Sequence, residues 1–145
     1  MLPEFNNDGN LPEGIHLATE DEVFLRFATP SARRQWLGEQ LRNLLALAKS
    51  TRQLSRVFLW GSFVTSKEVP NDIDVLLVMT ADFALERLPT PCHVLFDHVQ
   101  ARLGFHADVF WTKASLDAPV LQLWLDTYQT SKDFKRRGIV EVIVS

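Results

Sequence analysis

The sequence predicts an α/β fold in which helices cover a mixed β-sheet of about four strands. Segments with helical spacing of apolar residues alternate with short runs rich in β-branched and aromatic residues, in the order α-α-β-β-α-β-α-β. The length of 145 residues matches one domain, and apolar residues make up 46% of the chain, which is enough for a packed core. A single sheet covered by helices accommodates this order of elements.

The chain is expected to begin with an irregular arm and to form one domain. Pro and Gly punctuate the first fifteen positions, so residues 1–17 are interpreted as the arm and residues 18–145 as the domain. No basic segment followed by an apolar one opens the sequence, and no apolar run is long enough to span a bilayer. The single cysteine excludes an intramolecular disulfide framework and a cysteine-only zinc site. We therefore expect a cytoplasmic protein without a membrane segment.

Two helices are predicted after the arm. Thr19 and Glu22 have the spacing of a capping box, which predicts a helix over residues 20–27. Ser31 follows a proline and caps a second helix over residues 32–49, where apolar residues recur at helical spacing.

In the rest of the chain, the spacing of apolar residues alternates between that of strands and that of helices. Short β-rich apolar runs predict strands, segments with helical spacing predict helices, and residues 63–71 are expected to be a loop or a helical turn. The predicted elements are strands over 57–60, 73–78, 106–111 and 139–144, and helices over 92–103 and 117–128.

Three aspartates carry the strongest chemical signal. Asp72 and Asp74 are separated by one residue at the start of a predicted strand, so both side chains point to the same face. Asp108 lies within a later strand among β-forming residues. If the two strands are adjacent, three carboxylates converge, which is the ligand set of a two-metal phosphoryl or nucleotidyl transfer site. The alternative is that residues 71–72 form a turn and that Asp74 is a solvated edge residue.

Gly61-Ser62, then Asp72-x-Asp74, and then Asp108 on a later strand resemble the nucleotidyltransferase superfamily of the DNA polymerase beta type. The small size resembles its minimal members, some of which are antitoxins. The resemblance implies a mixed-sheet nucleotidyltransferase fold and two Mg²⁺ ions, with Mn²⁺ as an alternative, held by the three aspartates. It also implies that Gly61 and Ser62 bind the phosphates of a nucleoside triphosphate, with ATP as the default, and that Asp108 helps to deprotonate the acceptor hydroxyl.

The sequence departs from the pattern of this family at one place. Minimal members have an arginine and a glycine shortly after Gly-Ser, whereas this chain has Val64, Thr65 and Ser66. Lys67 is the nearest base and is the candidate substitute, although lysine lacks the bidentate fork of arginine.

Two main functions remain open at this point, beside a third, a nucleotide-binding or regulatory domain that transfers nothing. The first is an enzyme that transfers a nucleoside monophosphate to a protein or RNA hydroxyl, with a partner toxin as one candidate acceptor. The second is a non-catalytic, antitoxin-like module that neutralises a partner by contact. The missing arginine favours the second, and the three clustered acids favour the first, because such a cluster is costly without a cation.

Other candidate residues have a structural and a functional interpretation. The formal charge of −3 argues against a strongly basic nucleic-acid coat protein, but the basic run at residues 135–137 is either solvated surface or a contact for phosphates or RNA. Cys92 is expected to be structural, and His106 is a secondary site candidate because it could share a strand face with Asp108. Among the tryptophans, Trp60 is expected to support the phosphate turn from behind, and the other three are expected in the core: Trp36, Trp111 and Trp124.

Overall fold

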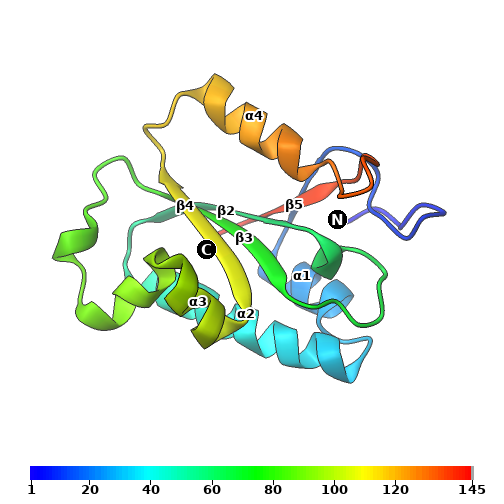
Figure 1. The fold of residues 1–145 in the computed structure, drawn as a ribbon, viewed down its shortest axis with the longest axis horizontal. Helices are drawn as coiled ribbons and strands as arrows, with labels where there is room; N and C mark the ends of the chain where they lie inside the picture. The colour runs from blue at the N-terminus through cyan, green and yellow to red at the C-terminus, as the bar shows by residue number, and fades with distance from the viewer. Residues whose placement is uncertain (145) are drawn as a thin grey trace.

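A mixed sheet forms the centre of the fold in residues 1–144, the part of the chain that the computed structural model describes (Figure 1). Its five strands have the spatial order β1-β5-β2-β3-β4. The outer pairs β1–β5 and β3–β4 are parallel, and the inner pairs are antiparallel. The strands are β1 (Ile15–Ala18), β2 (Leu54–Trp60), β3 (Ile73–Met79), β4 (Ala107–Lys113) and β5 (Ile139–Val142).

Helices cover both faces of this sheet (Figure 1). Three of them pack on one face over the larger apolar core, and α4 packs on the other face over a smaller cluster around Phe58, Leu76 and Leu125. The helices are α1 (Glu20–Phe27), α2 (Ala32–Ser50), α3 (His98–Phe105) and α4 (Ala118–Tyr128), with short 3-10 helices η1 (Ser62–Val64), η2 (Leu85–Arg87) and η3 (Thr90–Phe96).

The alternation of side chains along β3 places the carboxylates on the α4 face. Val75 and Leu77 point into the larger core, and Leu76 and Val78 point into the cluster under α4. Asp74 follows the same alternation as Leu76, because residues two apart in a strand share a face. The site therefore lies on the face that has only one helix, where room remains beside α4.

The predicted α/β class and mixed sheet are confirmed, and the sheet has one strand more than the expected four. The additional strand, β1, begins inside the segment 1–17 that was expected to be irregular and ends at Ala18. It pairs in parallel with β5, with His16 opposite Val140. Four residues at a sheet edge give too short a pattern to stand out from the surrounding Pro and Gly. Pairing with β5, the last strand of the chain, rather than local sequence, stabilises β1.

The helix predicted over 92–103 is wrong in its bounds. The segment begins as the 3-10 helix η3, and α3 starts only after Asp97, whose side chain accepts a hydrogen bond from the Gln100 backbone N–H. Asp97 thus acts as an N-cap, a role for which aspartate is well suited. His106, expected to start the next strand, instead ends α3 in a left-handed conformation with φ of 53°.

Two further expectations about side chains have different outcomes. Trp36 is 43% exposed rather than in the core, and its ring packs edge-on against His106 with centroids 5.1 Å apart. Trp111 and Trp124 are partly buried against the two core clusters. Cys92 is buried within the larger core, as expected of a structural cysteine.

Candidate functional site

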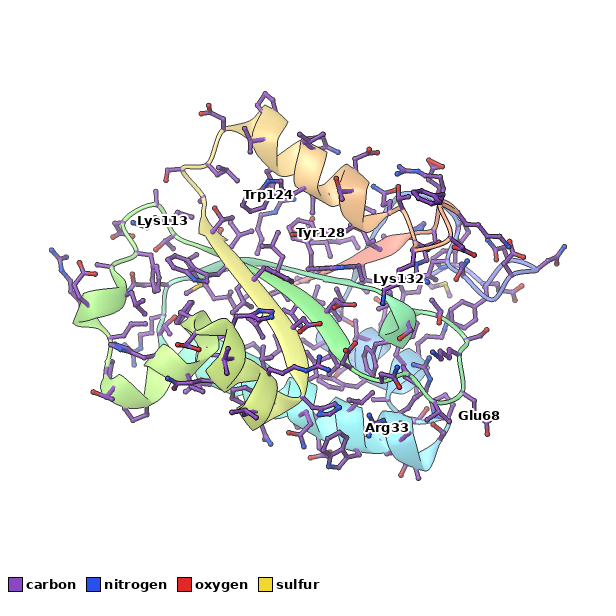
Figure 2. The ribbon with its side chains drawn as sticks, in the orientation of Figure 1. Arg33, Glu68, Lys113, Trp124, Tyr128 and Lys132 are labelled. Atoms are coloured by element: carbon purple, nitrogen blue, oxygen red, sulfur yellow. The ribbon has the colours of Figure 1, made fainter. Side chains whose placement is uncertain are left out.

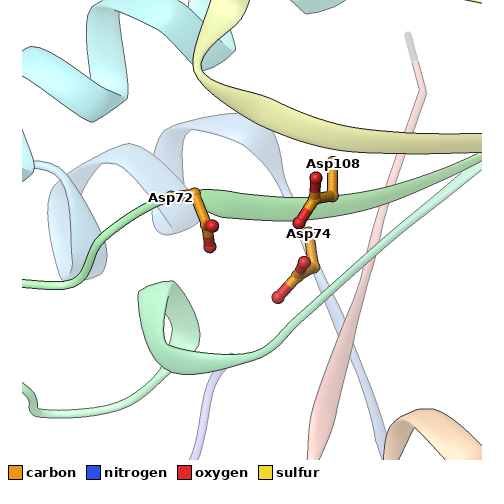
Figure 3. Close-up of side chains that lie close together, drawn as sticks. All are labelled: Asp72, Asp74 and Asp108. Atoms are coloured by element: carbon orange, nitrogen blue, oxygen red, sulfur yellow. The ribbon is translucent and has the colours of Figure 1, made fainter. Parts of the chain in front are cut away.

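The three predicted aspartates lie together on the α4 face of the sheet (Figure 3). Asp74 and Asp108 are register partners in the parallel pair β3–β4, and Asp72 directly precedes β3. Each aspartate offers a carboxylate oxygen that lies within 4.8 Å of the oxygens of the other two. The adjacency of β3 and β4, on which the sequence-based clustering depended, is thus present.

Burial and mutual repulsion act most strongly on Asp74. Burial, followed by the negative charges of Asp72 and Asp108, raises the pKa of Asp74 from its ordinary 3.8 to about 7. Arg137 and Arg102 act in the opposite direction but do not cancel the shift. A nearby cation would strongly stabilise the charged form of this carboxylate, because a positive charge offsets both the cost of burial and the repulsion from the other two carboxylates.

Arg102 supplies part of that positive charge, although its place in the sequence does not mark it as a site residue. Its Nη1 atom lies 2.7 Å from Oδ2 of Asp72 and 3.3 Å from Oδ1 of Asp108. The hydrogen bond to Asp72 is the main reason that the pKa of Arg102 is raised. Arg102 is on α3, which ends directly before β4, so the short connection brings it next to the carboxylates. No sequence motif marks this position.

The donor set fits a hard divalent cation. Three carboxylates converge from two neighbouring strand positions, and all the ligand atoms that they offer are oxygens. Mg²⁺ and Mn²⁺ favour carboxylate oxygen, and Mg²⁺ is commonly bound by one or two carboxylates together with substrate phosphates. The raised pKa of Asp74 agrees with this fit, since the carboxylate is placed where a cation would stabilise its charged form.

Gly61 allows the turn after β2 to approach the carboxylates. Its backbone has φ of 80°, a conformation that favours glycine. A Cβ added at this position would collide with Oδ2 of Asp74. The turn therefore brings the backbone of Gly61 into contact with the acidic cluster. One phosphate could then contact the backbone of the turn and a cation held by the carboxylates at the same time.

A buried arginine organises the segment that follows Gly61. Arg34 on α2 is only 2% exposed, and its guanidinium donates hydrogen bonds to the carbonyl oxygens of Phe63, Thr65 and Lys67. It also donates to the carbonyl oxygens of Ser62 and Phe27. With so many carbonyls turned toward one cation, the conformation of residues 62–67 is tied to α2. Arg34, like Arg102, was not recognised in the sequence.

A polar cavity of about 530 Å³ lies beside the acidic cluster. It is lined by the predicted phosphate residues Gly61, Ser62 and Lys67, together with Asp72 and Asp74. Lys132, labelled in Figure 2, and Arg137 join this lining from the segment after α4. Five of the six predicted site residues thus share one cavity, and the basic run near the C-terminus contributes Arg137 to it.

An aromatic groove of about 540 Å³ lies on the Asp108 side of the cluster. Phe110 and Trp111 of β4 form one wall, and Trp124 and Tyr128 of α4, visible between that helix and the sheet in Figure 2, form the other. His98 belongs to the same groove and reaches the cluster, because its Nε2 lies 3.5 Å from Oδ1 of Asp108.

Of the two remaining candidate residues, Trp60 lies beside the acidic cluster and His106 does not contact it. Trp60 stacks on Tyr128 with ring centroids 3.7 Å apart and is the register partner of Asp74, so it supports the site from the neighbouring strand. His106 lies away from the carboxylates in its contacts, with Nε2 3.3 Å from Arg33 Nη2. Arg33 also donates to the carbonyl oxygens of Pro70 and Asn71, which fixes the backbone before Asp72.

Comparisons with known proteins identify a family without assigning a function. Within residues 1–144, no helix combines the length and the apolar composition needed to cross a membrane. No curated protein and no solved structure matches the chain. A family model described as "Family of unknown function (DUF6932)" matches residues 3–143, almost the whole chain. The chain that carries this acidic cluster therefore belongs to the DUF6932 family.

Proposed function

We propose that the protein is a metal-dependent nucleotidyltransferase that moves a nucleoside monophosphate from ATP to a hydroxyl group. One observation carries the proposal: three carboxylates converge, and two of them, Asp72 and Asp74, line a polar cavity together with the tight turn at Gly61. A cluster of acids that binds cations and a glycine turn that approaches anions are the two halves of a site for a metal-bound polyphosphate.

Each group of residues has a role in this proposal. Asp72, Asp74 and Asp108 hold the cations, Mg²⁺ or Mn²⁺. When bound, the divalent cations would neutralise part of the negative charge of the phosphates and lower the pKa of the attacking hydroxyl. The backbone at Gly61 and Ser62 holds the phosphates that leave as pyrophosphate. Asp108, on the side away from the polar cavity, takes the proton of the acceptor hydroxyl as the new oxygen–phosphorus bond forms.

The acceptor in this proposal is a hydroxyl of a protein or of an RNA end that approaches from the side of Asp108. The aromatic groove on that side offers a surface on which such an acceptor can rest. A partner toxin remains one candidate, and a cytoplasmic location is part of the same proposal.

Label transfer from ATP tests the proposed reaction. The protein is incubated with Mg²⁺ and with ATP labelled at either the α- or the γ-phosphate, together with total protein or total RNA of the cell that encodes the chain. Transfer of the α label alone, lost in Asp74→Asn and retained in Asp117→Asn, is expected. Asp117 is an exposed aspartate whose side chain makes no capping hydrogen bond, so it serves as a matched control. Transfer of the γ label, or transfer to neither fraction, would contradict the proposal.

One observation favours a second function, a non-catalytic module that neutralises a partner by contact. Arg102 already places a positive charge against Asp72 and Asp108, so the acidic cluster is partly compensated without any metal. A folded protein that binds neither Mn²⁺ nor ATP would support this second function over the first.

A further inference from the structure

The segment between α4 and β5 brings an arginine to the polar cavity, far in sequence from the turn at Gly61. We propose that Arg137 is the guanidinium that binds the terminal phosphates of the substrate. This inference rests on the proposed function and names a phosphate ligand within it. It also addresses the absence of an arginine directly after Gly61-Ser62, because a residue from another part of the chain takes that place.

Arg137 lines the cavity and carries one buried donor that has no partner among the described residues. Its Nε atom is buried and has no hydrogen-bond acceptor among residues 1–144. A buried donor without an acceptor is costly in a folded protein, and such groups call for an explanation such as a bound ion or ligand. Because this atom has almost no exposed surface, an anion in the cavity would satisfy it once the guanidinium turns toward the anion.

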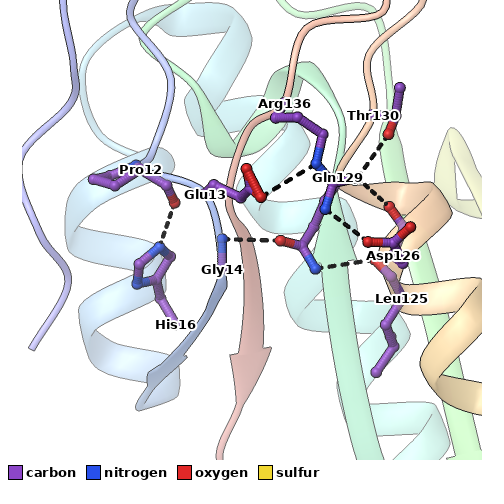
Figure 4. Close-up of polar contacts among 9 residues, drawn as sticks. All are labelled: Pro12, Glu13, Gly14, His16, Leu125, Asp126, Gln129, Thr130 and Arg136. Atoms are coloured by element: carbon purple, nitrogen blue, oxygen red, sulfur yellow. Dashed lines mark hydrogen bonds and ion pairs between the residues drawn. The ribbon is translucent and has the colours of Figure 1, made fainter.

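The neighbouring Arg136 shows the opposite arrangement (Figure 4). Its guanidinium pairs with Glu13 at 3.3 Å and with Asp126 at 2.7 Å, and it also donates to the hydroxyl of Thr130. Two consecutive arginines therefore differ sharply: the side chain of Arg136 is used to join the arm to α4, and the side chain of Arg137 lines the cavity.

The backbone around Arg137 is held by two other segments. Its N–H donates to the carbonyl oxygen of Gln129 at 2.8 Å, and the N–H of Gly138 donates to the carbonyl oxygen of Leu11 at 2.9 Å. The side chain of Gln129 is buried and accepts a hydrogen bond from the N–H of Gly14 (Figure 4). The position of Arg137 is thus fixed by the end of α4 and by the N-terminal arm.

The chemistry of the cavity points to a polyphosphate. A guanidinium binds phosphate oxygens through two parallel hydrogen bonds, which a lysine ammonium does not do. Lys67 and Lys132 line the same cavity and add point charges. The four aspartates in the lining, Asp8, Asp72, Asp74 and Asp133, would repel a bare anion, so the ligand that fits is a polyphosphate accompanied by a divalent cation.

Calorimetric titration tests this inference, with three probes in the presence of Mg²⁺: ATP, inorganic tripolyphosphate and AMP. Arg137→Gln is expected to weaken the binding of ATP and of tripolyphosphate by about tenfold or more, the range for a lost charge-assisted hydrogen bond. Binding of AMP should change less than twofold. Arg137→Lys should recover part of the affinity, and Arg87→Gln, at an exposed arginine of η2, should leave it unchanged. Because AMP and tripolyphosphate respond differently, a general loss of structure would not reproduce the pattern.

Each other outcome overturns a different claim. If the unmodified protein binds ATP and Arg137→Gln binds it equally well, the inference about Arg137 is wrong and the proposed function stands. If the unmodified protein binds neither ATP nor tripolyphosphate, the proposed function is wrong as well. Should Arg137→Gln fail to fold, Arg137→Lys decides, because equal affinity of that variant for ATP and tripolyphosphate would show that the guanidinium fork is not used.

Discussion

The guanidinium of Arg102 lies against two of the three carboxylates in the acidic cluster, with Nη1 2.7 Å from Asp72 and 3.3 Å from Asp108. A divalent cation bound at this cluster would therefore compete with Arg102 for the same oxygens. The charge of Arg102 stabilises the cluster when no metal is bound, and it opposes the entry of one. Under the proposed function, this competition would determine how strongly the cluster holds a metal.

Replacement of Arg102 by glutamine is therefore expected to raise Mn²⁺ affinity several-fold. The same change should lower the free energy of unfolding in EDTA by up to about 1 kcal/mol, because the ion pair is partly exposed. Calorimetry with Mn²⁺ and urea denaturation measure the two effects, and Arg87→Gln, at an exposed arginine of η2, serves as the control. Weaker Mn²⁺ binding by Arg102→Gln would show that the arginine positions the carboxylates rather than competing with the metal.

Gly61→Ala tests the close approach of the turn to Asp74. A methyl group there would collide with the carboxylate, and the positive φ adds backbone strain, so we expect a loss of about 1–3 kcal/mol in the free energy of unfolding. Binding of ATP should also weaken. Gly104→Ala is the matched control, since its Cβ would lie 3.8 Å from Val94, an ordinary contact. Equal stability of the two alanine variants would contradict the assigned role of the turn.

Arg34→Met tests the buried arginine that organises residues 62–67. The substitution keeps much of the side-chain volume but leaves the surrounding carbonyl groups without a donor, so a loss of about 3 kcal/mol or more is expected. Arg34→Lys should lose less, because an ammonium retains charge and some donors. Urea denaturation measures both. A smaller loss for methionine than for lysine would mean that packing, and not hydrogen bonding, determines the role of Arg34.

The raised pKa of Asp74 predicts a specific pH dependence in the absence of metal. Between about pH 4 and pH 7 the folded protein holds a proton on Asp74 that the unfolded chain has lost, so stability from this group falls as pH rises through that range. Asp74→Asn removes the dependence, because the amide mimics the neutral acid. The stability gained by the substitution should be larger at pH 8 than at pH 5, by a few kcal/mol at most, at about 1.4 kcal/mol per pKa unit. Urea unfolding in EDTA at both pH values measures it, and parallel pH profiles for the two proteins would contradict the prediction.

The sequence predicts the acidic cluster because its geometry is local. Asp72 and Asp74 share a face through strand periodicity, and Asp108 needs only that β3 and β4 be neighbours. The cations around the cluster are different. Arg34, Arg102 and Arg137 come from two helices and a late loop, and only tertiary packing brings them to the site. Nothing in the spacing of Arg34 and Arg102 distinguishes them from surface residues, whereas Arg137 belongs to the basic run at residues 135–137, which the sequence marks as either solvated surface or a contact for phosphates or RNA.

The same distinction explains the errors in the predicted fold. The strong helical period of α2 and the apolar run of β3 are properties of the segments themselves. The strand β1 depends on its partner β5, from the other end of the chain. The helix boundary at Asp97 depends on its side chain, which caps α3. The spacing of apolar residues continues across Asp97, so the prediction from spacing alone placed one helix over residues 92–103.

The most direct test of the central claim is the affinity of the acidic cluster for a divalent cation. Calorimetric titration with Mn²⁺ would compare the unmodified protein with Asp74→Asn, Asp108→Asn and the exposed control Asp117→Asn. We predict that the unmodified protein and the control bind Mn²⁺ alike, and that each of the other two variants binds it at least about tenfold more weakly, roughly 1.4 kcal/mol or more. Equal Mn²⁺ affinity in all four proteins, or no binding by the unmodified protein, would contradict the assignment of Asp72, Asp74 and Asp108 as one metal site.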